Sequence, residues 1–188
     1  MDALALLGNR INAVNSTMHR LAGDVAGLDL SEPIAFGTSP LGLTLWHLPR
    51  TQDWLVNTSI RGVPEVADEF GVAALPSVEE FGYGTGLSAA DARAAAERVD
   101  LDDLIAYSDA VALTISRWLA TLAEPDLDGV PEFAKHQYTR PAYCTPEALA
   151  EVEHLDGLTI GELMLRPAVS HVFAHVGEIE LLVQLVRH

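Results

Sequence analysis

The chain has 188 residues, of which 49% are apolar and 20% are charged. This length and composition are typical of one globular domain with a sizeable core, so we expect residues 1–188 to form a single domain. Acidic residues outnumber basic ones by 27 to 11, and the net charge is -16. Such a charge repels phosphate backbones and anionic lipid surfaces, which argues against nucleic acid and membranes as partners.

The N-terminus and the cysteine content favour the cytoplasm. The first residues, Met1-Asp2-Ala3-Leu4, lack the basic stretch of a signal peptide. We also expect no membrane span, because no apolar run approaches the roughly 20 residues that one requires. Cys144 is the only cysteine, which excludes an internal disulfide and agrees with a reducing compartment. We therefore expect a cytoplasmic protein in which Cys144 is an inert, small apolar residue.

The first half of the chain contains two helical patterns and a long connection. Apolar residues at intervals of three or four predict a helix over residues 3–22. Ser39 followed by Pro40 indicates the N-cap and first residue of a second helix, which runs to about residue 60. Residues 61–87 contain two prolines and several glycines, so we expect a long irregular crossover, of the kind that covers a site.

The second half of the chain is also helical. A short helix is expected over residues 88–99 and a long one over about 101–123. Thr145 begins another short helix, and Thr159 with Glu162 forms a capping box for a last helix that runs towards the C-terminus. No segment shows the alternation of apolar and polar residues that a strand requires. The sequence thus predicts an all-α fold, a four-helix bundle with a long crossover and short extra helices.

The last helix carries two histidines with metal-ligand spacing. His171 and His175 are four residues apart, and Glu178 follows three residues later. On a helix these side chains fall within about 60° of one another, and such a histidine pair presents two imidazoles to one ion. Glu178 is then a fourth ligand, a general base or a hydrogen-bond partner of a ligand. A solvated helix face is the alternative, although the apolar neighbours Val172 and Phe173 favour burial.

A third histidine lies in the second helix. His47 occurs in the sequence Trp46-His47-Leu48, which the acidic and aromatic pair Asp53-Trp54 follows. This motif, the Phe- and Gly-rich crossover and the final HxxxH followed by Gly-Glu resemble, in this order and over essentially the whole chain, the DinB-like superfamily. The resemblance implies a four-helix bundle in which His47, together with the two histidines of the last helix, binds a divalent metal.

The resemblance also implies an activity. Three protein ligands leave coordination positions open, as in catalytic metal sites. Related proteins act as thiol transferases that use bacillithiol or mycothiol, so we expect a metal-dependent thiol transferase acting on a small thiol and an electrophile. Ten arginines against one lysine suggest a high-GC coding bias and favour mycothiol. Zinc is the expected metal, and nickel, iron and copper also suit imidazole. Glu178 is the candidate helper base.

Two alternatives to this interpretation remain open at the level of the sequence. The first is a non-catalytic, stress-associated bundle that binds metal without turning over a substrate. The second concerns assembly, because a homodimer and a monomer are both compatible with these residues.

Three further residues are candidates for binding the thiol cofactor. Arg50 and Trp54 follow His47 by three and seven residues, with Thr51 between them, and can line the same cavity. Tyr83 can reach the same ligand from the crossover. The structural alternatives are core packing for Trp54 and a loop anchor for Tyr83.

Two prolines lie inside predicted helices close to the candidate ligands. Pro49 follows His47 by two residues, and Pro167 precedes His171 by four. Each removes a backbone donor, so we expect a kink or bulge beside the site. Asp53 points away from the His47 face and is expected to be a structural hydrogen-bond acceptor. The remaining histidines have no spacing that suggests a site: His19, His136, His154 and His188.

Overall fold

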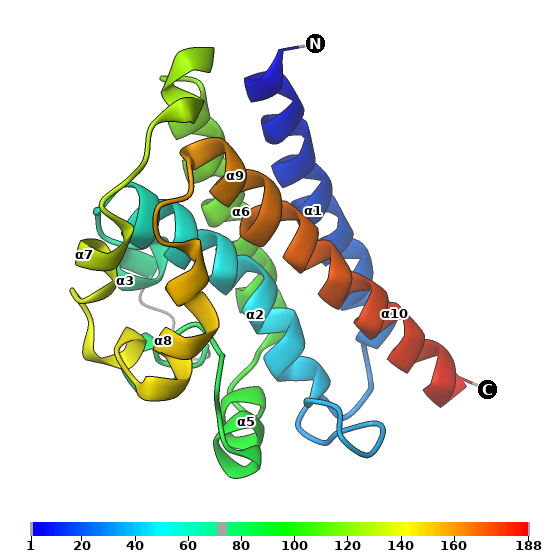
Figure 1. Ribbon diagram of the computed structural model, residues 1–188. Helices are drawn as coiled ribbons and strands as arrows, with labels where there is room; N and C mark the ends of the chain where they lie inside the picture. Colours follow the sequence, from blue (N-terminus) through cyan, green and yellow to red (C-terminus); the bar gives the residue numbers. More distant parts are fainter. Residues whose placement is uncertain (1, 71–74, 188) are drawn as a thin grey trace.

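The computed structural model describes residues 2–70 and 75–187, and within these ranges the chain forms helices and no strands. The predicted all-α class is therefore confirmed. Four long helical segments form the body of the molecule (Figure 1). They are α1 (Ala3–Val25), α2 (Leu41–Asp53) with a π-helical extension η1 (Trp54–Ile60), α6 (Leu101–Leu119), and a last helix over Ile160–Arg187.

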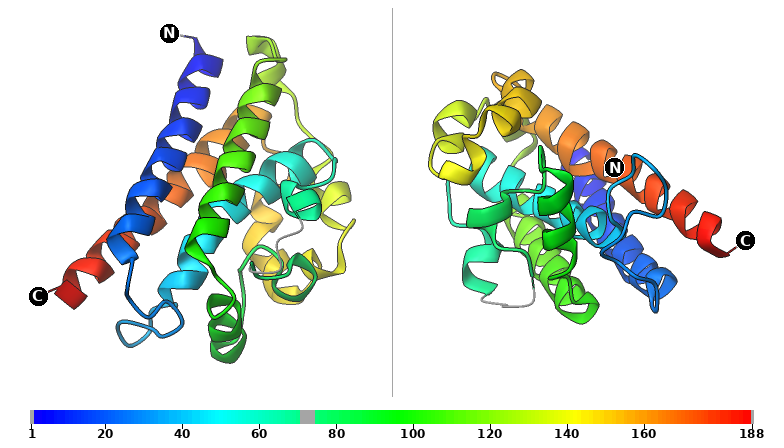
Figure 2. Two further views of the ribbon diagram at one scale, coloured as in Figure 1. Left: turned by 180° about the vertical axis from the view of Figure 1, so that it is seen from behind. Right: turned by 90° about the horizontal axis from the view of Figure 1, so that it is seen from below.

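The four long helices pack side by side, with α1 and α2 each between α6 and α10. Helix α1 contacts α6 and α10, and α2 contacts α6 and α10. In Figure 1, α1 and the last helix run downwards, whereas α2 and α6 run upwards, and Figure 2 shows the same directions from behind. Because α2 and α6 are parallel, the chain must return along the whole length of the molecule between them, which requires the long crossover.

Helix α1 forms because one of its faces is apolar at helical spacing. Its buried residues are Leu7, Ile11, Val14, Met18, Leu21 and Val25. The side chain of Asp2 accepts a hydrogen bond from the backbone of Ala5 and caps the N-terminus. The helix continues three residues beyond the predicted end at residue 22.

Helix α2 is the central helix, and every residue from Leu41 to Ile60 is buried. It begins one residue later than predicted, since Pro40 occupies the N-cap position and makes no side-chain capping bond. The predicted cap by Ser39 is therefore wrong. Pro49 lies inside the helix, which continues without a break and changes to π-helical geometry from Trp54 onwards.

The crossover is less irregular than predicted. It contains two short helices, α3 (Val66–Phe70) and α4 (Val78–Phe81), and continues into α5 (Ala89–Ala96). Residues 71–74 of the predicted crossover lie outside the described ranges. The carboxylate of Asp53 accepts hydrogen bonds from the backbone amides of Val66 and Ala67, at 2.9 and 3.0 Å, so the predicted structural role of Asp53 is confirmed.

The remaining short elements follow α6, which ends four residues before the predicted boundary at residue 123. As predicted, the side chain of Thr145 caps a short helix, accepting from the backbone of Ala148 at 3.1 Å. The connection before and after it also contains helical turns that the sequence did not indicate. The predicted helix is α8 (Pro146–Val152), and the turns that were not predicted are η2 (Glu124–Asp128), α7 (Phe133–Gln137), η3 (Pro141–Tyr143) and η4 (Glu153–Leu155).

The last helix has three parts: α9 (Ile160–Leu165), the π-helical segment η5 (Arg166–His171), and α10 (Val172–Arg187). The predicted capping box is present, with Glu162 accepting from the backbone of Thr159 at 2.9 Å and Thr159 accepting from Glu162 at 3.3 Å. The bulge expected beside Pro167 is also present, as the π-helical segment itself.

The last helix corrects one expectation about membranes. By length and composition, the 28 residues Ile160–Arg187 are apolar enough to cross a membrane, with a mean hydropathy of 1.3 in an 18-residue window that is 33% buried. The expectation that no apolar stretch approaches the length of a membrane span is therefore wrong. In this fold the helix packs against α1 and α2, and its inward side chains Leu163, Val172 and Ile179 belong to the core.

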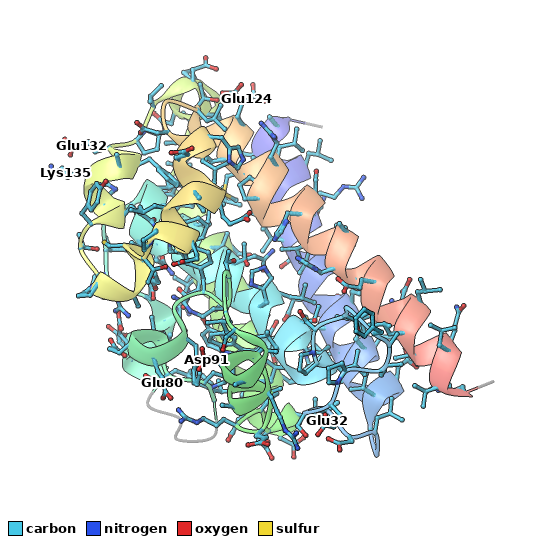
Figure 3. The ribbon with its side chains drawn as sticks, turned by 60° about the horizontal axis from the view of Figure 1, so that its bottom comes forward. Glu32, Glu80, Asp91, Glu124, Glu132 and Lys135 are labelled. Carbon is cyan, nitrogen blue, oxygen red and sulfur yellow. The ribbon has the colours of Figure 1, made fainter. Side chains whose placement is uncertain are left out.

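The excess negative charge is distributed over the surface. Glu32, Glu80, Asp91, Glu124 and Glu132 are all exposed, and Figure 3 labels them on separate parts of the molecule. Some of these carboxylates pair with basic groups: Glu132 lies 2.6 Å from the ammonium of Lys135, and Glu80 lies 2.5 Å from Arg98.

Candidate metal centre

The structure brings His47, His171 and His175 together, although 124 residues separate the first from the second. His47 comes from α2, His171 from the end of η5, and His175 from the first turn of α10. One nitrogen of each ring lies within 4.8 Å of the corresponding nitrogens of the other two. The three side chains can therefore contact one ion.

The spacing of these nitrogens fits a small divalent cation. The Nε2 atoms of His47 and His171 are 3.1 Å apart. Three imidazoles bound to one ion at about 2.0–2.1 Å in tetrahedral geometry would have their nitrogens about 3.3 Å apart. The rings meet edge to face, with centroids 4.6–5.4 Å apart, so they converge rather than stack. This donor set could hold a metal ion with only small movements of the side chains.

The orientation of His47 is set by the crossover. Its Nδ1 lies 2.6 Å from the backbone carbonyl of Tyr83. Because a carbonyl oxygen only accepts hydrogen bonds, Nδ1 must carry a proton, and Nε2 presents its lone pair to the other two histidines. Burial lowers the pKa of His47 to about 3, assisted by the charge of His175 and opposed by the Tyr83 carbonyl. Burial likewise lowers the pKa of His171. Near neutral pH both rings are therefore uncharged, as metal ligands must be.

A glycine-rich turn places the Tyr83 carbonyl beside His47. Gly82 and Gly84 have φ angles of +58° and +88°, which L side chains rarely adopt. A Cβ atom added to Gly84 would lie 3.2 Å from Nδ1 of His47 and 3.2 Å from Trp46. The close approach of this turn to the histidine thus requires glycine at position 84.

Glu178 contacts a ligand ring. Its Oε2 atom lies 3.0 Å from Nδ1 of His175, which leaves the Nε2 atom of His175 for an ion. Among the described residues, no carboxylate or thiol joins the three imidazoles in the cluster. Of the three roles considered for Glu178, the geometry matches the hydrogen-bond partner of a ligand, an arrangement that fixes the ring and raises its basicity.

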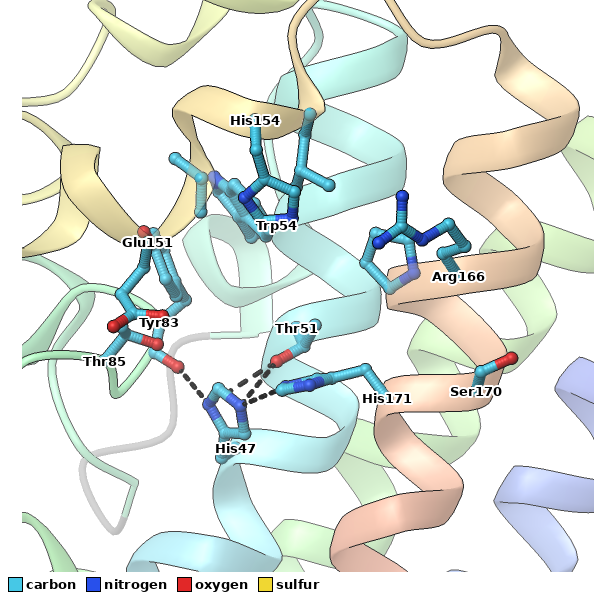
Figure 4. A pocket seen from close by; sticks show the side chains of 13 residues that line it. His47, Thr51, Trp54, Tyr83, Thr85, Glu151, His154, Arg166, Ser170 and His171 are labelled. Carbon is cyan, nitrogen blue, oxygen red and sulfur yellow. Dashed lines mark hydrogen bonds between the residues drawn. The ribbon is translucent and has the colours of Figure 1, made fainter.

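A cavity of about 390 Å³ opens beside His47 and His171 (Figure 4). Trp54 and Tyr83 form one wall, with their rings stacked at a centroid distance of 4.3 Å. Both therefore lie where a bound small molecule would contact them, as expected. They are also anchored in the core, because Trp54 Nε1 donates to Gln137 at 3.0 Å and the Tyr83 hydroxyl donates to the Ala148 carbonyl at 3.0 Å.

Arg50, which was expected to share this cavity, lies elsewhere. It is completely buried, and its guanidinium pairs with Glu65 at 2.6 Å and donates to the hydroxyl of Tyr143. Its Nε donates to the carbonyl of Gly82 at 3.3 Å. The anionic and phenolic groups around it raise the pKa of Arg50 despite its burial. Arg50 therefore holds the glycine-rich turn and does not face the cavity.

Several residues of the cavity were not identified from the sequence. His154 was assigned to no site, yet it lines the cavity because α8 and η4 fold over α2. Arg166 and Ser170 line it from η5, and their only sequence signal was Pro167, which marked the bulge without showing where it would turn these side chains. The remaining lining residues are Thr51, Thr85, Glu151, Val152, Leu155 and Pro167.

Neither a protein-family model nor a curated protein matches this chain.

Proposed function

We propose that this protein is a DinB-like four-helix-bundle enzyme that binds a divalent metal and transfers a small thiol, of the mycothiol type, to an electrophile. His47, His171 and His175 are the proposed ligands, and zinc is the first candidate for the ion. The observation that carries the proposal is the convergence of three imidazoles, of which His47 and His171 line a cavity open to small molecules.

The ligand number supports an activating rather than a purely structural ion. Structural zinc sites are closed by four protein ligands, whereas three leave a position for an exogenous group. A divalent ion in such a site lowers the pKa of a bound thiol and keeps it as thiolate at neutral pH. The sequence resemblance to the DinB-like superfamily favours a thiol over water.

The surrounding side chains have roles that suit this chemistry. The Tyr83 carbonyl and the Glu178 carboxylate hold the rings of His47 and His175. Trp54 and Tyr83 shield one side of the cavity from water. The carboxylate of Glu178 lies on the Nδ1 side of His175 and does not line the cavity, so its role here is to hold the ring, and the proton that the thiol releases passes to solvent at the open side of the cavity. A carbon–sulfur bond would then form as the halide of a haloalkane departs, as the C–O bond of an epoxide opens, or as the C=C π bond of an activated alkene breaks, with a proton from solvent completing the last two products.

The cavity has a suitable size. Ligand pockets in proteins usually enclose about 300–1,000 Å³, and the volume here of about 390 Å³ lies within that range. It suits a small thiol or electrophile with part of its surface exposed.

The test is a comparison of metal content and thiol transfer in the full-length protein and its variants. We expect about one ion per chain, lost in His171→Ala and His175→Ala and retained in His19→Ala, in which a histidine on the exposed face of α1 is removed. The metal-loaded parent is incubated with mycothiol and a panel of haloalkanes, epoxides and activated alkenes, and conjugates are detected by mass spectrometry.

Two results would contradict the proposal. A parent protein that binds no divalent ion excludes the metal site. A parent that binds the ion but forms no conjugate above the level of the His175→Ala variant supports the non-catalytic metal-binding alternative.

A further inference from the structure

Arg166 places a positive charge in the wall of the histidine cavity. Its side chain extends from the last helix beside His171 (Figure 4). Among the residues that line the cavity, it is the one with a permanent positive charge. Glu151 lies on the other side of the cavity, next to Tyr83 and Thr85. The two walls of the cavity therefore carry opposite charges.

The π-helical segment η5 brings Arg166 to the side of the helix that carries His171. The two residues are five positions apart. On an α-helix, side chains at this separation point about 140° apart. In a π-helix, with roughly 4.4 residues per turn, the same separation leaves them about 50° apart. The bulge thus serves to put a cation and a candidate ligand into the same cavity, and such bulges are frequent at functional sites.

Arg166 is exposed, and within the described residues its guanidinium makes no hydrogen bond or ion pair, although its charge adds to the Thr159 hydrogen bonds that lower the pKa of Glu162. The carboxylate one helical turn earlier, Glu162, accepts from both the backbone and the hydroxyl of Thr159 in the capping box. Six of the other nine arginines have a carboxylate within 4 Å in the described part of the chain, whereas Arg10, Arg61 and Arg117 do not. Arg93 pairs with Glu32, and Arg98 pairs with Glu80, each at 2.5 Å.

We propose that Arg166 binds the carboxylate of an acidic small molecule whose reacting group lies at the three histidines. This inference rests on the proposed function and specifies its substrate class. The planar guanidinium donates two parallel hydrogen bonds to a carboxylate. A single guanidinium balances one negative charge, which favours a monoanion over a phosphate dianion. Glu151 repels an anion from the opposite wall, so the carboxylate has one preferred orientation.

The test uses the cobalt-substituted, full-length protein and pairs of thiols of equal length. Mercapto acids with two to six carbons are compared with the corresponding neutral mercapto alcohols, and the thiolate-to-cobalt absorption band reports binding. At the best length we expect the acid to bind at least about tenfold more tightly than the alcohol, the effect of a charge-assisted hydrogen bond. The preference should be lost in Arg166→Gln.

Arg117→Gln is the matched control, because Arg117 is exposed on α6 and does not line the cavity. This variant should keep the acid preference. If thiols bind without any acid preference, or if the preference survives in Arg166→Gln, the inference is wrong while the proposed function stands.

A second measurement is independent of the metal and of thiols. The Nε–H signal of Arg166 in a nitrogen-15 NMR spectrum is identified by its loss in Arg166→Gln, and the protein is titrated with butyrate or with butanol. A shift of the Arg166 signal with butyrate but not with butanol supports the anion site. If that shift is seen but no thiol binds, only the proposed thiol chemistry is wrong. If the Arg166 signal does not move at high butyrate concentration and no thiol binds either, both the carboxylate site and the proposed function are wrong.

Discussion

Replacing Gly84 with alanine tests whether the crossover sets the orientation of His47. Gly84 has a φ angle of +88°, and an added Cβ would lie 3.2 Å from both Nδ1 of His47 and the Trp46 ring. The left-handed backbone alone costs about 1–2 kcal/mol for an alanine. The two close contacts must also be relieved, and both neighbours are buried, so the turn has to move away from the ring.

That movement acts on the metal site through one hydrogen bond. The Tyr83 carbonyl lies 2.6 Å from Nδ1 of His47 and fixes both the tautomer and the direction of the ring. Loss of such a partner typically lowers metal affinity by about 10–100-fold. We therefore expect Gly84→Ala to bind zinc about 10–100-fold more weakly, as measured by competition with a chromophoric chelator.

Gly157→Ala is the control that separates the cost of the positive φ angle from the close contact of an added Cβ with His47 and Trp46. Gly157 has a similar φ angle of +80°, but an added Cβ meets nothing within 4 Å. Urea denaturation of the metal-free proteins should show a loss of about 1–2 kcal/mol for Gly157→Ala and at least as much for Gly84→Ala. Only Gly84→Ala should lose zinc affinity. Equal zinc affinity in the two variants would refute the assignment of the turn as the support of His47.

The other predictions concern the ligands and the buried charges around them. His175→Ala should abolish tight metal binding while the far-ultraviolet circular dichroism stays helical, because the core is built from apolar contacts outside the site. Glu178→Gln should weaken zinc binding by about 10–100-fold without abolishing it, and unchanged affinity would reduce Glu178 to a solvated helix residue. Arg50→Met should lower the free energy of unfolding by about 3 kcal/mol in urea, since it removes the closest positive charge from the buried carboxylate of Glu65 and leaves Arg140, at 3.5 Å, as its charged partner. In the metal-free protein the pKa of His47 is about 3, below its ordinary value of 6.5, so the unfolded chain takes up the proton first. The contribution of His47 to the free energy of unfolding should therefore be fully present above about pH 6.5 and be lost as the pH falls towards 3. In a plot of the free energy of unfolding against pH, His47→Gln should reduce the slope over this range by at most about 1.4 kcal/mol per pH unit.

The long helices and the caps by Thr145 and Thr159 were predictable because they depend on neighbouring residues, whereas the predicted cap by Ser39 was wrong. The spacing of Leu7, Ile11 and Val14 defines one face of α1 without reference to any other element. The capping box of Thr159 and Glu162 consists of two hydrogen bonds across three residues. Such local bonds form in the same way wherever the helix later packs, so the sequence indicates them directly.

The three histidines were predictable for a different reason. Imidazole is a frequent metal ligand, and the spacing of His171 and His175 restricts them to one helix face. That His47 completes the set depends on the packing of α2 against α10, which spacing along the chain does not reveal. It was inferred from the resemblance to a known superfamily.

Thr51, Trp54 and Tyr83 were predicted to line the cavity and do so, but the arginines near it were placed wrongly or missed, because their positions depend on helix geometry and on burial. Arg50 and Arg166 illustrate the two cases. Arg50 lies one turn from His47, yet the complete burial of α2 requires every polar side chain on it to find a partner inside the protein, and Arg50 pairs with Glu65. Arg166 would point away from His171 on a regular helix, and only the π-helical segment turns it towards the cavity.

The buried polar network is also what connects the fold to the site. Arg50 bridges Glu65, which precedes α3, and the carbonyl of Gly82, which belongs to the turn that holds His47. Asp53, one turn further along α2, binds the first amides of α3. The crossover is therefore fixed to α2 at both of its ends by charges that cannot reach water. Because an unpaired buried charge is costly, the turn bearing Tyr83 has little freedom to move, and His47 keeps the orientation that a metal ligand requires.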